Sequence, residues 1–90
     1  MIRYSILVSG RVQGVGFRFF TQLTATNLKL TGWCKNLNDG KVQIEIQGSD
    51  ETINKFISAL KKGNNFSRVD EMEINKIPTV EIENKYSIKY

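Results

Sequence analysis

Apolar residues recur at every second position in two stretches of the chain, residues 2–9 and residues 42–47. This two-residue period predicts strands with one buried face, because successive side chains of a strand point to opposite sides. The apolar positions are Ile2, Tyr4, Ile6 and Val8 in the first stretch and Val42, Ile44 and Ile46 in the second. Residues 31–37 have a β-type composition, and the Asn-Asp-Gly sequence at residues 38–40 predicts the turn of a hairpin.

Two further stretches have the spacing of helices that pack on a sheet. In residues 17–28, apolar side chains spread over about half of a helical circumference, which predicts a broad buried face. These side chains are Phe17, Phe19, Phe20, Leu23 and Leu28. Residues 50–62 predict a second helix, with apolar residues at helical spacing between Ile53 and Leu60. Ser49 is expected to cap its start, and Gly63 is expected to end it.

Residues 69–77 and 86–90 return to a β-type pattern. The chain therefore runs strand, helix, strand, strand, helix, strand, with a short terminal strand. This order is typical of the α+β ferredoxin-like fold, a split βαβ sandwich in which an antiparallel sheet of four to five strands carries both helices on one face. A right-handed crossover makes the first two strands run in the same direction. Residues 10–18 and 36–40 are therefore expected to be neighbours in space.

The length and composition narrow the chemistry further. Ninety residues, 40% hydrophobic and 24% charged, are enough for one soluble globular domain, residues 1–90, with a single core. The chain has no His, and its only Cys is Cys34. This excludes His-dependent triads, metal sites built on His or Cys, and an internal disulfide. We therefore expect chemistry that needs neither a metal nor another cofactor.

The net charge of +4 is spread along the chain, and acidic side chains lie among the basic ones. This distribution disfavours a nucleic-acid-binding stripe, and a small phosphate or carboxylate fits the mild positive field better. No apolar run approaches the roughly 18 residues that span a membrane, and residues 1–9 are too short and too polar for a signal peptide. We therefore expect a cytoplasmic protein with no nucleic-acid or membrane partner.

Three glycines lie in residues 10–18, between the first strand and the first helix. Such a loop can turn consecutive backbone N–H groups inward around an anion, and the helix N-terminus adds its own free amides. The segment lacks the third glycine of a dinucleotide fingerprint and the Gly-Lys-Ser/Thr of a Walker loop. Arg18, where loop becomes helix, can grip two phosphate oxygens as a bidentate pair. Taken alone, Arg18 also fits an ordinary solvated helix residue, and the glycines also fit simple turn formers.

Two segments carry a resemblance to a known family. GRVQGVGFR at residues 10–18 resembles the signature of the acylphosphatase family, and GWCKNLNDG at residues 32–40 resembles its second motif. The two motifs stand in the family's order and separation, and the length and aromatic C-terminal ending of the chain are also similar. The departures are small. Cys34 stands where the family usually has Val, Leu37 where some relatives have Thr, and Asn64 where many have Pro.

The resemblance implies an enzyme that hydrolyses the carboxyl–phosphate anhydride of small acyl phosphates to a carboxylate and inorganic phosphate, without a metal or cofactor. By analogy, Arg18 and backbone amides of the loop hold the phosphoryl group, and Asn36 orients the attacking water. The implied phosphate-binding residues are Gln13, Gly14, Val15, Gly16, Phe17 and Arg18. Taken alone, Asn36 would fit a hairpin residue that ties its own turn, but its predicted place beside the loop favours the role on water. The enzyme is expected to be a monomer that inorganic phosphate inhibits as product.

Trp33 and Cys34 each have two interpretations. Trp33 on such a sheet could stack on a base, as in RNA-recognition modules, but residues 41–47 lack the aromatic strand of those modules. Partial burial in the core is therefore the favoured interpretation of Trp33. For Cys34, core packing is favoured over a redox role, because little around it in the sequence would stabilise a thiolate. A non-enzymatic anion-binding module remains the alternative to an enzyme.

Overall fold

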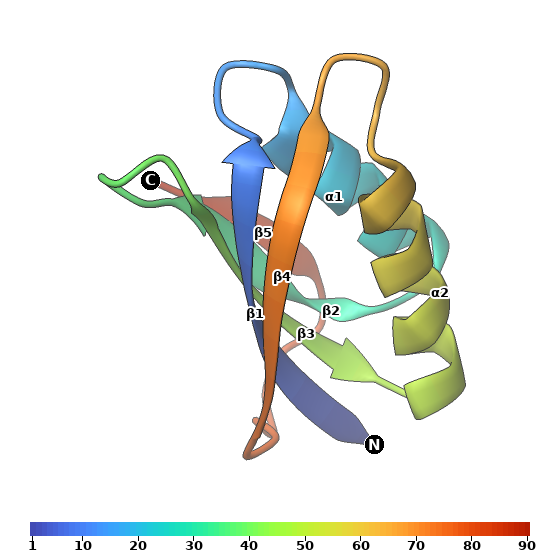
Figure 1. Ribbon diagram of the computed structural model, residues 1–90. Coiled ribbons are helices and arrows are strands. Elements are labelled where there is room, and N and C mark those ends of the chain that lie inside the picture. The colour runs from blue at the N-terminus through green and yellow to red at the C-terminus, as the bar shows by residue number, and fades with distance from the viewer.

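The computed structural model describes residues 1–90 and contains seven regular elements (Figure 1). They are β1 (Ile2–Arg11), α1 (Phe17–Asn27), β2 (Thr31–Asn36), β3 (Val42–Gly48), α2 (Asp50–Lys62), β4 (Arg68–Ile77) and β5 (Tyr86–Lys89). The five strands form one sheet in the order β4-β1-β3-β2-β5, and both helices cover the same face of it. This is the α+β ferredoxin-like arrangement that the sequence predicts.

The first four strands pair antiparallel, and β5 adds a parallel pair with β2, so the sheet is mixed. β4 ends at the end of the sheet where β2 begins, because Arg3 pairs with Ile77 and Thr31 pairs with Gln47. A chain that leaves β4 and crosses to the far edge must therefore enter β5 in the direction of β2. The parallel pair follows from this crossing.

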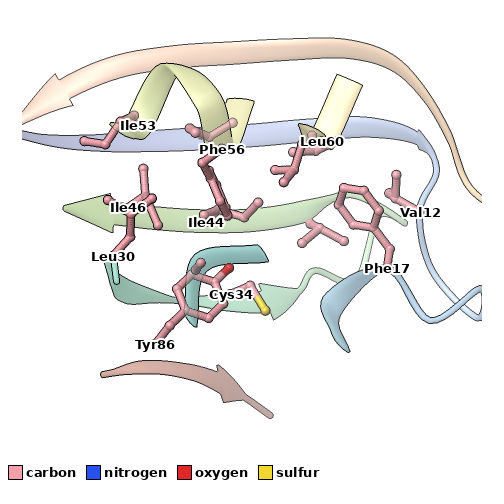
Figure 2. Close-up of a cluster of buried hydrophobic side chains, with 14 residues drawn as sticks. Val12, Phe17, Leu30, Cys34, Ile44, Ile46, Ile53, Phe56, Leu60 and Tyr86 are labelled. Atoms are coloured by element: carbon pink, nitrogen blue, oxygen red, sulfur yellow. The ribbon is translucent and has the colours of Figure 1, made fainter. Parts of the chain in front are cut away.

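The core lies between the helices and the sheet (Figure 2). Ile53, Phe56 and Leu60 of α2 are fully buried against the inner face of β3. The fully buried residues of that face are Val42, Ile44 and Ile46. Ser49 caps α2 by accepting a hydrogen bond from the amide of Thr52, as the sequence predicts. Neither helix has the length and apolar character needed to cross a membrane.

The buried face of α1 is narrower than the apolar pattern predicts. Phe19 is 59% exposed and Leu23 is 48% exposed, so their predicted burial is wrong. The buried residues of α1 are Phe17, Thr21 and Ala25, which stand one helical turn apart. Small residues at two of these positions let the helix approach the sheet closely. The hydroxyl of Thr21 is satisfied there, 2.8 Å from the carbonyl oxygen of Arg18.

The opposite face of the sheet is covered at one end by residues 78–85. Arg3 is only 2% exposed on this face and is paired with Glu45 and Glu83 at 2.9 and 2.8 Å. Trp33 is partly buried, as the sequence predicts, but it lies outside the core cluster. The ammonium of Lys89 lies 4.4 Å from the centre of its ring. The predicted core position of Trp33 is therefore wrong, because its strand position faces away from the helices.

Three loops meet at the other end of the sheet: residues 12–16, residues 37–41 and residues 63–67 (Figure 1). The side-chain amide of Gln13 donates hydrogen bonds to the carbonyl oxygens of Leu37 and Lys41, at 2.8 and 2.9 Å. The glycine loop and the β2–β3 hairpin are thus neighbours, as the crossover argument predicts.

Candidate active site

The loop between β1 and α1 is shaped by two glycines in the left-handed backbone region. Gly14 has a φ of 72° and Gly16 has a φ of 74°. A Cβ atom on Gly14 would meet no atom within 4 Å, so this position needs glycine for its dihedral angle and not for space. Gly16 precedes α1 without a side-chain cap, and the first turn of α1 has no acidic residue. The backbone amides of this first turn have no acceptors within the helix. They lie at the positive end of the helix dipole, which attracts anions.

A pocket of about 290 Å³ opens at this helix end. Of the predicted phosphate-binding residues, Gly14, Gly16, Phe17 and Arg18 line it, and the predicted catalytic residue Asn36 lines it as well. The other lining residues are Val12, Phe19, Ile88 and Tyr90. The pocket thus joins a polar cradle to an apolar and aromatic rim.

Two predicted phosphate-binding residues, Gln13 and Val15, do not line the pocket. Gln13 uses its side chain to join the loop to the hairpin that follows Asn36. The side chain of Val15 packs against the core. Their side chains therefore hold the loop in place, and only their backbone groups remain to meet a ligand.

The charge of Arg18 is not neutralised by any carboxylate. The three ion pairs of the structure belong to Arg3 and Arg68. The nearest charge-related contact of Arg18 is the ring of Tyr90, whose centre lies 5.1 Å from the guanidinium carbon. A cation–π contact of this kind holds the guanidinium without neutralising its charge, so the group remains able to bind an anion.

Asn36 lines the same pocket and carries an unpartnered acceptor. It is the last residue of β2, and its Oδ1 is buried without a hydrogen-bond partner. A buried amide oxygen without a donor costs about 1–3 kcal/mol of stability, so native proteins seldom retain one without a reason. A bound water or ligand that donates to Oδ1 would remove this cost. This observation argues against the alternative that Asn36 only ties the hairpin.

Cys34 lies beneath the pocket and has the environment of a core residue. It is fully buried among the core side chains (Figure 2), and its Sγ is 3.5 Å from the hydroxyl of Thr21. Burial raises the pKa of the Cys34 thiol, although hydrogen bonds with Thr21 and Tyr86 oppose the shift. Burial also raises the pKa of Tyr86 far above its ordinary value. Both groups therefore stay protonated near neutral pH, which fits core packing and not redox chemistry.

Sequence reasoning missed two residues that shape the site. Tyr90 belongs to the aromatic ending of the chain, but nothing in the sequence indicates that it meets Arg18. Asn64 donates a hydrogen bond to the carbonyl oxygen of Val15 at 2.9 Å, across a sequence separation of 49 residues. The only signal was that Asn64 stands where many proteins with these motifs have proline.

The fold and the pocket define a small α+β domain with a glycine loop and a helix N-terminus beside a pocket at one end of its sheet. Comparisons with known proteins all identify the same family. Residues 4–88 match the family model described as Acylphosphatase. The chain is 57% identical to an acylphosphatase of Clostridium beijerinckii, over the full length of both chains. It therefore belongs to the acylphosphatase family.

Solved structures agree with this assignment. The crystal structure of acylphosphatase from Bacillus subtilis superposes with a TM-score of 0.95 at 42% identity, and all of both chains is covered. A crystal structure of full-length HypF in a phosphate- and nucleotide-bound form contains a similar domain. The match there has a TM-score of 0.89 at 30% identity and covers 99% of this chain but only 12% of HypF.

Proposed function

We propose that this chain hydrolyses the carboxyl–phosphate anhydride of small acyl phosphates, releasing a carboxylate and inorganic phosphate. One observation carries the proposal: a single pocket in a member of this family is lined by a free helix N-terminus, an arginine without a carboxylate partner, and Asn36, whose amide oxygen has no hydrogen-bond partner. These are the groups needed to hold a phosphoryl group and to place a water beside it. Residues 1–90 would act as one domain.

Arg18 and the amides of residues 13–18 bind the phosphoryl oxygens in this proposal. The bidentate guanidinium and the dipole of α1 oppose the negative charge that spreads over these oxygens in the transition state. Because these groups are fixed before the substrate arrives, little reorganisation is needed during the reaction. Inorganic phosphate presents the same oxygens and is therefore expected to inhibit competitively.

Asn36 orients the attacking water through its side-chain amide group. The water oxygen forms a bond to phosphorus while the bond from phosphorus to the acyl oxygen breaks, and the carboxylate leaves with that electron pair. A carboxylate needs no protein acid to leave, because its conjugate acid has a pKa near 4. No Asp, Glu or His side chain lines the pocket, so the proton of the water passes to a phosphoryl oxygen or to bulk water.

The apolar rim of the pocket is suited to the acyl part of the substrate. Phe19, Ile88 and Tyr90 line the pocket beside the phosphate cradle. Phe19 and Tyr90 are large apolar groups exposed to solvent, 59% and 91% respectively, and a small organic acyl group would cover part of this surface. We further propose a cytoplasmic, monomeric enzyme that uses no metal or cofactor and binds no nucleic acid or membrane.

Release of phosphate from a small acyl phosphate, such as benzoyl phosphate, tests the proposal. We expect turnover that EDTA leaves intact and that inorganic phosphate inhibits competitively. Loss of activity in EDTA, restored by a divalent cation, would contradict the mechanism. A non-enzymatic anion-binding module would bind phosphate with no turnover above that of the Arg18→Ala variant, which is the matched control.

A further inference from the structure

The turn after α2 is held by the side chain of one residue, Asn64. Its Oδ1 accepts hydrogen bonds from the amides of Phe66 and Ser67, at 3.1 and 2.8 Å. This is the arrangement in which an asparagine side chain stabilises its own turn. The backbone amide of Asn64 in turn donates to the hydroxyl of Ser67 at 3.1 Å. The acceptor side of the Asn64 amide group is thus fully engaged within the turn.

The donor side of the same amide group leaves the turn and reaches the glycine loop. Nδ2 of Asn64 donates to the carbonyl oxygen of Val15 at 2.9 Å. The two loops lie next to each other at the upper end of the molecule in Figure 1. Asn64 does not itself line the pocket, whereas Gly16, the residue after Val15, does. Asn64 therefore contacts the loop from outside the pocket.

Because the peptide bond is planar, this contact also fixes the direction of the Gly16 N–H group. The carbonyl of Val15 and the N–H of Gly16 belong to one trans peptide unit, so they point in opposite directions. A bond that holds the Val15 carbonyl toward Asn64 directs the Gly16 N–H away from Asn64. Gly14 and Gly16 are both conformationally permissive, so this peptide unit has little intrinsic stiffness. An external hydrogen bond is an effective way to fix it.

We propose that Asn64 is a positioning residue of the phosphate loop, which fixes the Val15–Gly16 peptide so that the Gly16 amide is oriented for a phosphoryl oxygen. The inference rests on the proposed function to the extent that a phosphoryl group is the ligand of this loop. The hydrogen bonds to Oδ1 hold the turn in one conformation, and the hydrogen bond from Nδ2 restrains the glycine loop against that turn. The position of the turn thereby sets the affinity of the site.

Two variants of Asn64 separate its two roles. Asn64→Ala removes both, and Asn64→Asp keeps the acceptor that holds the turn but loses the donor to Val15. We expect the inhibition constant of inorganic phosphate and the KM for the acyl phosphate to rise about three- to tenfold in both variants, as for the loss of one hydrogen bond. Asn64→Asp also tests the inference if Asn64→Ala does not fold.

Two neighbouring residues supply matched controls. Ser67→Ala removes a hydrogen bond of the turn and leaves the Asn64–Val15 bond in place, so it should lower the urea midpoint with an unchanged phosphate inhibition constant. Asn65→Asp adds the same charge at an exposed position where no side-chain hydrogen bond is lost. Measurements in 1 M KCl, where the Debye length is about 3 Å, remove most of the charge effect but not the effect of the lost bond.

The outcomes are distinguishable from those of the proposed function. Weaker phosphate inhibition in both Asn64 variants, retained in 1 M KCl and absent in Ser67→Ala, supports the inference. Lower stability with an unchanged inhibition constant overturns it and leaves Asn64 as a turn residue only. If the parent shows no turnover, the proposed function fails, and phosphate binding followed by the backbone NMR signal of Gly16 still tests Asn64. A Gly16 signal that phosphate does not shift in the parent overturns the inference, whatever the turnover.

Discussion

Arg3 and Arg18 lie at opposite ends of the sheet and show two opposite uses of the same side chain. Arg3 is 2% exposed, and two carboxylates and the side-chain oxygen of Gln47 surround its guanidinium. Arg18 is partly exposed, has no carboxylate partner, and rests on the ring of Tyr90. The charge of Arg3 is neutralised inside the fold, whereas the charge of Arg18 remains available to bind an anion.

The difference shows that the same side chain can stabilise the fold through ion pairs or stay unpaired in a pocket, where its charge can act on a ligand. The structure gives Arg3 its partners through residues 78–85, which bring Glu83 over the sheet. Arg18 has no carboxylate partner, so its charge does not stabilise the fold through an ion pair. Substitutions of the two arginines should therefore affect different quantities, activity for Arg18 and stability for Arg3.

The largest expected effect is on turnover in Arg18→Ala. Loss of the bidentate group should lower kcat/KM by about 10²–10³, equivalent to roughly 3–4 kcal/mol of transition-state stabilisation. Arg18→Lys should restore little, because a point charge cannot reproduce the planar fork. Steady-state kinetics on a small acyl phosphate measures both. Near-parental turnover in Arg18→Lys would mean that charge alone suffices.

Arg3→Met should reverse this pattern. The variant keeps an apolar stem but leaves Glu45 and Glu83 without their cation, which should lower the free energy of unfolding by about 3 kcal/mol. We expect the lower end of the range for buried pairs, because both carboxylates are partly exposed. Urea unfolding measures the loss. Turnover per folded molecule should stay near that of the parent, and a selective fall in kcat would contradict the division between the two ends.

Asn36→Ala should separate binding from chemistry within the site itself. If Oδ1 orients the water, turnover should fall about 10- to 100-fold while phosphate inhibition changes little, since the loop and Arg18 hold the phosphate. Asn36→Asp also places a negative charge beside an anion, so it should weaken phosphate inhibition as well. Steady-state kinetics with phosphate as inhibitor distinguishes the two variants. Near-parental turnover in Asn36→Ala would return Asn36 to a hairpin role.

Acid should weaken the Arg3 end of the molecule. Burial would raise the pKa of Glu83, but hydrogen bonds from Arg3 and Thr31 more than offset it, so the pKa lies below its ordinary value of 4.5. A lowered folded pKa gives stability that is present above the unfolded value and is lost as the pH falls through the folded one. The urea concentration at the unfolding midpoint should therefore decrease as the pH is lowered below about 4.5. The loss should be smaller than in Arg3→Met, because the neutral carboxyl group of Glu83 can still accept a hydrogen bond from Arg3.

Glu83→Gln is the control for this pH dependence. The pKa of Asp70 is also lowered, by its hydrogen bonds from Arg68, so the parent loses stability in acid from more than one group. The difference between parent and Glu83→Gln isolates the contribution of Glu83. It should be largest near neutral pH and shrink as the pH falls. A difference that does not depend on pH would show that Glu83 acts through packing and not through its charge.

The elements of this fold could be predicted because each has a periodic pattern. Val42, Ile44 and Ile46 alternate because one face of β3 meets the helices, and the sequence records that contact directly. No pattern in the sequence predicts that Arg3 is buried. Its burial depends on residues 78–85, which form no helix or strand, so their position follows only from the completed structure. The patterns of Phe19 and Leu23 led to the opposite error, since exposed apolar residues look like core residues in sequence, and of the two only Phe19 lines the pocket.

The site was predictable where local sequence creates its chemistry. Glycines at positions 14 and 16 indicate left-handed backbone, and the crossover rule alone brings Asn36 near the loop. The roles of Arg18 and Asn36 came from resemblance and remain predictions. The pairing of β1 with β4 brings the loops of Val15 and Asn64 to the same end of the sheet, but neither periodicity nor topology could indicate the single side-chain bond between them.

The smallest expected effect concerns the contact that keeps Arg18 in place without neutralising it. Tyr90 is 91% exposed, and a cation–π contact at an exposed site contributes about 0.5–1 kcal/mol. Tyr90→Leu should therefore raise the phosphate inhibition constant and the KM about two- to fivefold, because the guanidinium loses the surface that restricts its rotamers. Tyr90→Phe keeps the ring and should match the parent. If Tyr90→Leu instead binds phosphate more tightly, the ring competes with the ligand for Arg18, and the arginine at the active end is restrained in the way that Arg3 is, only more weakly.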